Sequence, residues 1–366
     1  MNTNATNGLL RPIAFFMVGV LLVCTFGFTV DGWQINNNGT TDLPNTDTST
    51  NDKIVTVEKE EAPTEENLPK IPDFVNYLTG LETTEELSKL RPVAVLMSSN
   101  TANYGISSAD ILCEIPTEDD TTRFLAIISD TSGLWKIGSI ANGRGYISNI
   151  SKFFGATIIC DKYEDITSYE QCDVSKEMLD ISNYPNSYYK EYDLYSFTNS
   201  DMLSNALSST LPDLAQNPKV PCIFNDFGNE PVSGETEAKK ISVTYSSLSK
   251  TELIYNEQTA AYTLLKNGNQ KCDAINGKMM EFTNCFVLFA DSVTYDNASG
   301  TELVMDTIGS GEGYYFTNGT MLKIKWSSDV DGNLVFTDTN GNPIAVNRGK
   351  SYIGYVKSST IDNVKY

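Results

Sequence analysis

Histidine does not occur in this sequence, and its absence removes several kinds of active site at once. Without an imidazole the chain cannot form a Ser-His-Asp triad, use a histidine general base or bind a metal through histidine. The C-x-x-C spacing is also missing, which leaves no signal for a zinc knuckle or a thioredoxin-like redox site. The sequence therefore predicts no metal and no cofactor, and any catalysis would rest on carboxylate, Lys, Tyr, Ser or Cys side chains.

Basic residues are scarce as well. The chain has 26 Lys and Arg against 47 Asp and Glu, which gives a net charge of −21. A surface this acidic repels the phosphates of nucleic acids and the anionic head groups of lipids. The charge balance therefore predicts no nucleic acid partner.

Cysteine is present in a number that leaves the redox state open. Of the seven cysteines, Cys24 lies in an apolar segment and six follow it. An even number permits disulfides, but the spacings do not fix a pairing. The alternative is that these cysteines are small, buried, apolar side chains. The six are Cys113, Cys160, Cys172, Cys222, Cys272 and Cys285.

The longest uncharged hydrophobic run lies at the N-terminus, within residues 1–30. Residues 13–30 read IAFFMVGVLLVCTFGFTV, which is at the short end of the length needed for a membrane-spanning helix. Arg11 precedes the run, so the positive-inside rule places the N-terminus in the cytoplasm and the rest of the chain outside the cell membrane. Two alternatives stay open: a cleaved signal peptide, and lipidation at Cys24, although Val23 stands where a small residue is usual. All three place the bulk of the chain outside the membrane.

Residues 31–71 are rich in Asn, Thr, Asp, Glu and Pro, with stretches such as NTDTSTND and EKEEAPTEEN. This composition buries too little apolar surface to offset the entropy that ordering would remove, so the segment is predicted to be a disordered tether. A flexible chain of about forty residues spans roughly 35 Å root-mean-square. That reach would hold a folded domain away from a membrane surface.

Residues 72–225 alternate between short apolar runs and segments of helical spacing, which is the pattern of an α/β domain. The expected strands are Val93–Met97, Arg123–Ser129 and Thr157–Cys160, and the expected helices are Ile147–Phe154 and Asp201–Leu211.

Residues 238–358 change to strands separated by tight turns. Asn-Gly pairs occur at residues 267–268, 276–277, 318–319 and 340–341. An Asn-Gly pair between alternating runs is a strong hairpin signal, because both central residues of a type I′ turn need positive φ. The fold class expected for the whole chain is therefore α+β, with an α/β N-terminal domain followed by a mostly antiparallel β C-terminal domain.

The glycine-rich stretch DTIGSGEGYYFTNG at residues 306–319 raises the question of a phosphate-binding loop. Such loops are followed by a helix whose N-terminus holds the phosphate. Here the glycines are followed by two tyrosines, a phenylalanine and a predicted hairpin turn. The stretch therefore predicts no nucleotide, and instead a bulge or tight bend where strands approach closely.

Several blocks taken together are specific, although none would suffice alone. They are RPVAV at 91–95, GISSADILCEIPTEDDTTR at 105–123, the glycine-rich stretch at 306–319 and NRGKSY at 347–352. In this order they resemble the YerB-like putative lipoprotein family of Gram-positive bacteria, over residues 72–356. The resemblance implies a two-part extracytoplasmic protein whose biochemical activity is unassigned.

The departures from the family pattern concern polar groups. Asp119 and Asp120 stand where the family has two glycines, Ala141 replaces the first Arg of a GPVRSAR element, and a family histidine is gone. Leu264 stands where the family usually has Arg. If the family's polar cluster performs chemistry, these losses favour a binding or structural role over catalysis in this chain.

Five charged residues are the candidate ligand-binding site: Asp110, Glu114, Glu118, Arg123 and Arg144. Paired carboxylates could bind Ca²⁺ or act as an acid/base pair, and the two arginines could hold an anionic or sugar ligand by bidentate contacts. The alternative, favoured for residues 118–120, is a solvated acidic turn with Arg123 in a structural salt bridge.

The favoured function is binding at the cell envelope, to an envelope polymer or an envelope protein, by a protein held in the membrane through residues 13–30. The second hypothesis is a carboxylate-dependent hydrolase of envelope glycans. It requires two carboxyl groups about 5 to 9.5 Å apart across a cleft. The third is a purely structural interaction module, without a pocket between the domains.

Overall fold

The structure, a computed structural model, describes residues 70–366 apart from residues 165–176, 212–218, 221 and 298–299. The predicted anchor, Cys24 and Cys172, and nearly all of the predicted tether lie outside the described residues. Within the described part, no helix combines the length and the apolar character that crossing a membrane requires. The described residues belong to one compact unit.

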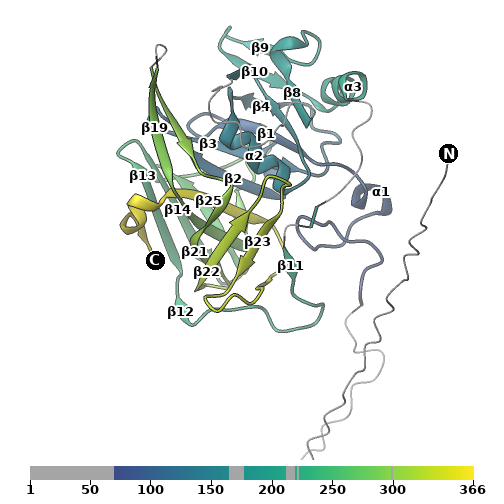
Figure 1. Cartoon of the computed structure of the whole chain (residues 1–366). Coiled ribbons are helices and arrows are strands. Elements are labelled where there is room, and N and C mark those ends of the chain that lie inside the picture. The colour runs from purple at the N-terminus through teal and green to yellow at the C-terminus, as the bar shows by residue number, and fades with distance from the viewer. Residues whose placement is uncertain (1–69, 165–176, 212–218, 221, 298–299) are drawn as a thin grey trace, which may run out of the picture. The chain divides into compact units, whose positions relative to one another are not determined.

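The described chain is mostly strands with few helices, as an α+β protein of this kind would be (Figure 1). The first part contains α1 Glu85–Ser88, β1 Val93–Ser98, η2 Ile106–Ser108, β2 Ile111–Pro116, β3 Thr122–Ile128, β4 Ile137–Ile140, β5 Gly143–Arg144, α2 Gly145–Phe153, β6 Thr157–Cys160, β7 Tyr163–Glu164, β8 Met178–Asp180, η4 Ile181–Asn183, β9 Tyr189–Glu191, β10 Tyr195–Thr198 and α3 Ser200–Thr210.

The second part contains strands and a 3₁₀ segment. They are β11 Ile223–Phe224, β12 Thr236–Glu237, β13 Lys240–Ser246, β14 Ser249–Asn256, β15 Ala261–Lys266, β16 Asn269–Gln270, β17 Glu281–Phe282, β18 Asn284–Ala290, β19 Ser292–Asn297, β20 Gly300–Met305, β21 Gly309–Thr317, β22 Thr320–Ser328, β23 Leu334–Thr337, β24 Ala345–Val346, β25 Ser351–Lys357, η5 Ser358–Asn363 and β26 Val364–Lys365.

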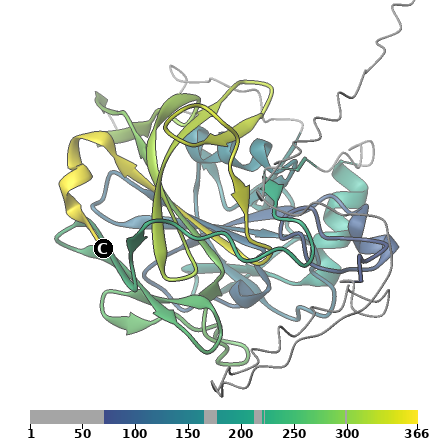
Figure 2. The same cartoon turned by 90° about the horizontal axis from the view of Figure 1, so that it is seen from below.

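One large mixed sheet runs through both parts of the chain. Its strand order is β12-β22-β21-β18-β25-β2-β3-β1-β4-β10-β9. The junction is the parallel pair of β2 and β25, in which Ile111 lies opposite Ser351 and Glu114 lies opposite Gly354. In the view from below, the N-terminal and C-terminal strands lie side by side (Figure 2). The sheet is therefore continuous across residues 72–225 and 238–358.

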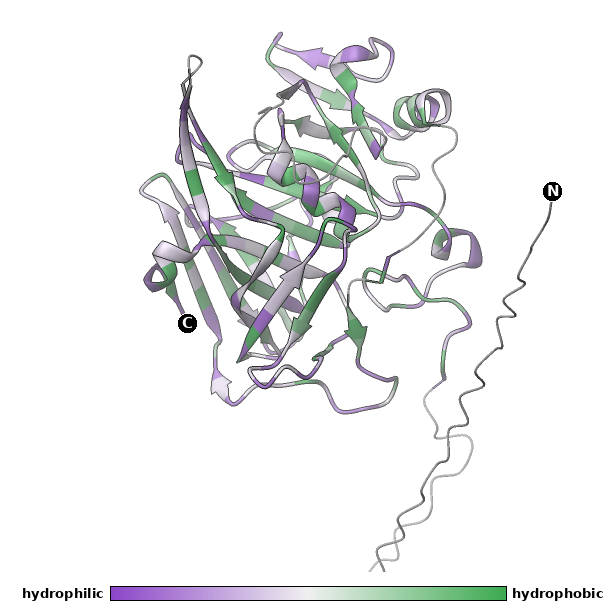
Figure 3. Cartoon of the chain, in the orientation of Figure 1, coloured by the Kyte–Doolittle hydropathy of each residue, from purple (hydrophilic) through white to green (hydrophobic). Residues whose placement is uncertain are grey.

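The predicted strand at Val93–Met97 is confirmed as β1, and its continuous apolar sequence has a structural reason. Val93, Val95 and Met97 pack into one buried cluster, whereas Ala94 and Leu96 pack into another on the opposite face. A strand covered on both faces needs apolar residues at successive positions rather than at alternate ones. The most hydrophobic segments accordingly gather in the central strands (Figure 3).

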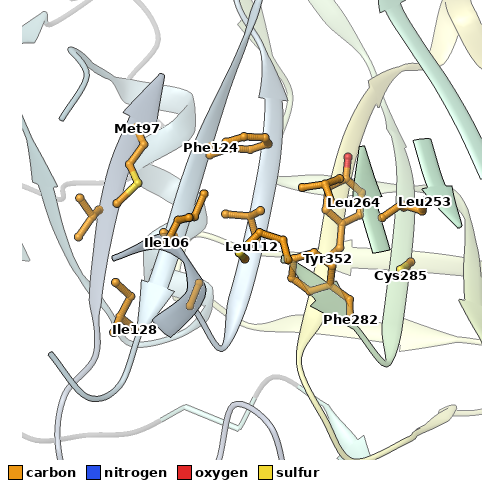
Figure 4. Close-up of a cluster of buried hydrophobic side chains, with 14 of the residues drawn as sticks. Met97, Ile106, Leu112, Phe124, Ile128, Leu253, Leu264, Phe282, Cys285 and Tyr352 are labelled. Atoms are coloured by element: carbon orange, nitrogen blue, oxygen red, sulfur yellow. The ribbon is translucent and has the colours of Figure 1, made fainter. Parts of the chain in front are cut away.

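The two faces of the sheet are covered by different elements. A second sheet, with strand order β16-β15-β14-β13-β26, contributes Leu253 and Leu264 to the same cluster as Leu112 and Phe124 of the large sheet (Figure 4). Helix α2 contributes Tyr146, among other residues, to the cluster on the opposite face. Cores shared in this way join the two parts of the chain.

The Asn-Gly pairs differ in how closely they follow the prediction. The pair between β15 and β16 and the pair between β21 and β22 have positive φ at both residues, with Asn267 at 50°, Gly268 at 80°, Asn318 at 50° and Gly319 at 70°. These two are type I′ hairpin turns, as predicted. At 276–277 and 340–341 only the glycine has positive φ, so these pairs lie in other turns.

The glycine-rich stretch forms β21, a regular strand paired along its length with β22 from Gly309 to Thr317, so the expected bulge or bend is wrong. The expected close approach is present. A Cβ at Gly311 would lie 2.4 Å from the carbonyl oxygen of Phe289 and 2.7 Å from Nε1 of Trp326. The indole of Trp326 crosses the strand here and donates a hydrogen bond to that carbonyl at 3.1 Å.

The described cysteines are all free thiols. Cys113, Cys160 and Cys285 are buried, and burial raises the pKa of each well above its usual range. The interpretation as small apolar side chains is confirmed for these three.

Candidate functional site

The first four predicted site residues lie on or beside the β2–β3 hairpin: Asp110 just before β2, Glu114 in β2, Glu118 in the turn and Arg123 in β3. Glu114 lies opposite Phe124 and Ile115 lies opposite Arg123 in the β2–β3 ladder. Because neighbouring side chains of a strand point to opposite faces, Glu114 and Arg123 lie on different faces of the large sheet. The predicted site residues therefore do not all lie on the same face of the large sheet.

Glu114 is fully buried between the two sheets. One carboxylate oxygen accepts hydrogen bonds from the Thr122 hydroxyl at 2.7 Å and from the ammonium of Lys266. The other accepts from the hydroxyls of Thr251 and Tyr352, each at 2.7 Å. Both carboxylate oxygens are therefore used inside the protein.

Burial alone would raise the pKa of Glu114, but the charge of Lys266 and the hydrogen bonds together lower it. The carboxylate is therefore ionised and paired with Lys266, whose side chain is 5% exposed. This pair joins β2 to β15. Sequence reasoning missed Lys266, although one signal was available: it follows Tyr262 and Leu264 at a spacing of two and so lies on the buried face of β15.

Asp110 precedes β2 at the end of the strand away from the β2–β3 turn. Its carboxylate accepts hydrogen bonds from the Ser129 backbone at 2.9 Å, from the Ser129 hydroxyl at 2.6 Å and from Asn76 at 3.3 Å. Burial raises the pKa of Asp110, and the Ser129 and Asn76 hydrogen bonds and Lys350 oppose this shift. The residue fastens β2 and β3 at this end.

The remaining predicted residues meet near the N-terminus of α2, in what we call the Arg144 cluster: Glu118, Asp119, Arg123, Arg144 and Tyr146. Arg144 is buried and donates a 2.6 Å hydrogen bond to Glu118 Oε1. The hydroxyl of Tyr146 donates a hydrogen bond to the carbonyl of Pro116 at 3.0 Å. It also interacts electrostatically with the other four residues of the cluster.

The Arg144 cluster includes polar atoms that have no hydrogen-bond partner among the described residues. Glu118 Oε2 and Arg123 Nε are buried and have no hydrogen-bond partner within the described part of the chain. Arg123 forms no ion pair among the described residues, so the expected structural salt bridge of Arg123 is not present there. Its charge instead acts on Asp119 at longer range.

The Asp119 carboxylate accepts hydrogen bonds from residues of its own turn. It accepts hydrogen bonds from the hydroxyls of Thr117 at 2.5 Å and Thr121 at 2.7 Å. Burial alone would raise the pKa of Asp119, but these hydrogen bonds outweigh burial and lower it. Asp120 is exposed and has a φ of 57°, so the predicted solvated turn is present at this residue. Glu118 instead forms an ion pair with Arg144 in the Arg144 cluster.

The three predicted carboxylates have different partners within the described residues. Asp110 lies just before β2, Glu114 within β2 and Glu118 in the turn after it. Glu114 is also closed off by its pair with Lys266, and Glu118 by its pair with Arg144. Among the described residues, no group of three or more Cys, Asp or Glu could hold a metal ion.

A second buried lysine lies near the Glu114 pair. Lys271 donates hydrogen bonds to the carbonyls of Ser99 at 3.0 Å and Thr101 at 2.8 Å. Burial lowers the pKa of Lys271 from 10.5 to about 8. Between pH 8 and pH 10.5 the unfolded chain therefore binds more protons at this side chain than the folded chain, so its contribution to stability increases as pH rises.

We expect a pH-dependent difference between the wild type and Lys271→Met. The free energy of unfolding of the wild type, minus that of Lys271→Met, should increase by up to about 1.4 kcal/mol per pH unit above pH 8. Urea unfolding of both proteins at several pH values up to 10 measures the difference. Cysteines and tyrosines also titrate in this pH range, but they contribute equally to the free energy of unfolding of both proteins, so their contributions cancel in the difference. A difference that is constant with pH would contradict the lowered pKa.

Comparison with known proteins places these elements in a family. Residues 78–210 match the model described as protein of unknown function (DUF3048) N-terminal domain, and residues 241–353 match the C-terminal domain of the same description. The putative lipoprotein YerB of Bacillus subtilis (strain 168) is 23% identical over 290 residues, covering 76% of this chain and 85% of that protein. The crystal structure of YerB protein from Bacillus subtilis matches with a TM-score of 0.69 at 22% identity, covering 80% of this chain and 99% of that chain. The chain therefore belongs to the YerB-like family, which combines the DUF3048 N-terminal and C-terminal domains.

Proposed function

We propose that this protein is a binding module of the cell envelope, held at the membrane through residues 13–30, with residues 31–71 as its tether and its ligand site in the Arg144 cluster. Residues 72–225 would act as an α/β part and residues 238–358 as a mostly antiparallel β part of the same module. The name of the relative from Bacillus subtilis, a putative lipoprotein, is consistent with attachment to a membrane.

The observation that carries the proposal is the pair of unsatisfied buried atoms, Glu118 Oε2 and Arg123 Nε. A buried polar group without a partner costs about 1 to 3 kcal/mol, and a ligand that supplies the partner recovers this free energy. One acceptor and one donor together suit the hydroxyl groups of a sugar, since a hydroxyl both donates and accepts. The ligand class supported is therefore an envelope glycan.

The carboxylates support binding better than hydrolysis. Glu118 and Glu114 are each held by a cation, and Asp110 lies at the far end of β2. A retaining or inverting glycosidase places both carboxyl groups on one cleft. We therefore propose no catalytic role for these residues.

Co-sedimentation with purified cell-wall sacculi tests this proposal. The full chain in detergent should pellet with sacculi, and Arg123→Gln should bind at least tenfold more weakly, since a hydrogen bond to a charged group contributes about 1.5 to 3 kcal/mol. Arg144→Ala is a poor test because it would leave the buried Glu118 carboxylate without its cation. The matched control is Lys365→Gln, which removes an exposed cation on β26.

The outcomes separate cleanly when the folding of each variant is checked by circular dichroism. Loss of binding in Arg123→Gln alone supports a glycan site in the Arg144 cluster. Equal pelleting of the wild type and Arg123→Gln, or no pelleting of the wild type, rejects it.

A further inference from the structure

A pocket far from the Arg144 cluster in sequence contains an arginine held by an aromatic ring. Its volume is about 280 Å³, and its lining includes Asp226, Phe227, Thr283, Asn318 and Arg348. The guanidinium carbon of Arg348 lies 3.6 Å from the centre of the Phe227 ring, close enough for a cation–π contact. The Phe227 ring therefore packs against the guanidinium group.

The backbone around Arg348 is fixed by several contacts. Asn347 accepts a hydrogen bond from Val232 N at 2.8 Å and donates one to Val232 O at 2.9 Å, which holds the Asn225–Val232 segment against the strand end. The next residue, Gly349, has a φ of 145°, and a Cβ there would lie 2.1 Å from the Thr283 hydroxyl. The pocket is therefore preorganised rather than assembled around a ligand.

The side-chain amide of Asn318 in the lining is already used by the protein. Asn318 donates to the Ser233 hydroxyl at 2.8 Å and accepts from the Tyr255 hydroxyl at 2.9 Å. Asp226 and Arg348 are the only charged residues in the lining, so they are the groups that can bind a charged ligand by ion pairing.

Arg348 presents one edge of its guanidinium without protein partners. Nη1 donates to the carbonyl of Gly80 at 2.6 Å. Nε is buried without a partner, and Nη2 has none among the described residues. The edge formed by Nε and Nη2 is the edge that binds a carboxylate through two parallel hydrogen bonds.

Asp226 indicates which class of carboxylate-bearing ligand the pocket would bind. It lies in the same lining, is exposed, and interacts electrostatically with Arg348. The chain as a whole carries a charge of −21, which opposes a ligand with net negative charge. A ligand that carries both a carboxylate and an ammonium avoids this repulsion and can face both side chains.

We propose that this pocket binds a small zwitterion, an α-amino acid or a dipeptide, with its carboxylate on the Nε–Nη2 edge of Arg348 and its ammonium toward Asp226. The volume is that of a small ligand, and the single cation in the lining does not suit a doubly charged phosphate. The site does not depend on the Arg144 cluster, so either one can fail without the other.

Isothermal titration of the full chain in detergent with four probes tests the proposal. Alanine or alanyl-alanine should bind, whereas alaninamide, which lacks the carboxylate, and propionate, which lacks the ammonium, should bind at least tenfold more weakly. Stronger binding of the dipeptide would assign the site to peptides, and equal binding would assign it to free amino acids. Binding of alaninamide as tight as that of alanine, or no binding of any probe at millimolar concentration, overturns the proposal.

Two variants locate the site. Arg348→Gln should weaken alanine binding about 10- to 100-fold, as expected for loss of a charged bidentate contact, while Lys365→Gln, which removes an exposed cation on β26, should leave it unchanged. Because Arg348 also contacts Gly80, its variant is compared with Asp226→Asn, an exposed position that should keep the fold. Asp226→Asn should abolish the preference for alanine over propionate. An unchanged preference in Asp226→Asn overturns the assignment even if Arg348→Gln does not fold.

Discussion

Replacing Lys266 by Met should lower the free energy of unfolding by about 3 to 5 kcal/mol, because it leaves the Glu114 carboxylate buried without its cation. The ammonium of Lys266 also donates to the hydroxyls of Ser249 at 2.7 Å and Thr122 at 2.9 Å. Those hydroxyls would lose a partner in the same substitution. Urea unfolding of the full chain, followed by circular dichroism, measures the change in stability.

The matched control is Lys250→Met on the neighbouring strand β14. Lys250 pairs with Glu252 at 3.1 Å, but its side chain is 44% exposed, so the control should change stability by less than about 1 kcal/mol. If Lys266→Met lowers the free energy of unfolding no more than this control does, the buried pair does not stabilise the fold. A double variant, Glu114→Leu with Lys266→Met, should recover part of the loss, since neither charge of the pair is left buried without the other.

Gly311→Ala should cost about 3 kcal/mol or more, because the added methyl group meets backbone rather than a movable side chain. The nearest atom, the carbonyl oxygen of Phe289, belongs to the neighbouring strand β18. To make room, the strand must shift or the indole of Trp326 must leave its hydrogen bond. Thermal unfolding measures the loss, and tryptophan emission should move to longer wavelength as the buried indole becomes exposed.

Ser310→Ala on the same strand serves as the control for Gly311→Ala. Ser310 is exposed and points to the opposite face, so this substitution should change stability by less than about 0.5 kcal/mol. Equal melting temperatures for the two variants would show that β21 and β18 can separate without cost at Gly311.

Local patterns were sufficient for elements whose cause is local. The helices predicted at Ile147–Phe154 and Asp201–Leu211 are α2 and α3, displaced by one or two residues. The strand at Thr157–Cys160 has the predicted bounds, and two Asn-Gly pairs form the predicted hairpin turns. In each case, spacing or turn chemistry within a short window determines the conformation.

Long-range pairing could not be predicted in this way. Nothing near Glu114 indicates that its cation is Lys266, on a strand 152 residues later in the chain. The same holds for Arg348, whose contact with Gly80 spans 268 residues. The glycine-rich stretch shows a further limit, because Gly311 is required by Phe289 and Trp326 on the two neighbouring strands and not by a local turn.

The parallel pair of β2 and β25 has a consequence for the order of folding. Residues 111–114 pair with residues 351–354, so a ribosome must add nearly two-thirds of the chain after β2 before this side of the strand can pair. Until then β2 presents an apolar edge that can join another chain. Loop closure over such a separation also makes folding slow relative to proteins with local contacts. Truncation anywhere before β25 should therefore yield aggregates rather than a folded N-terminal half.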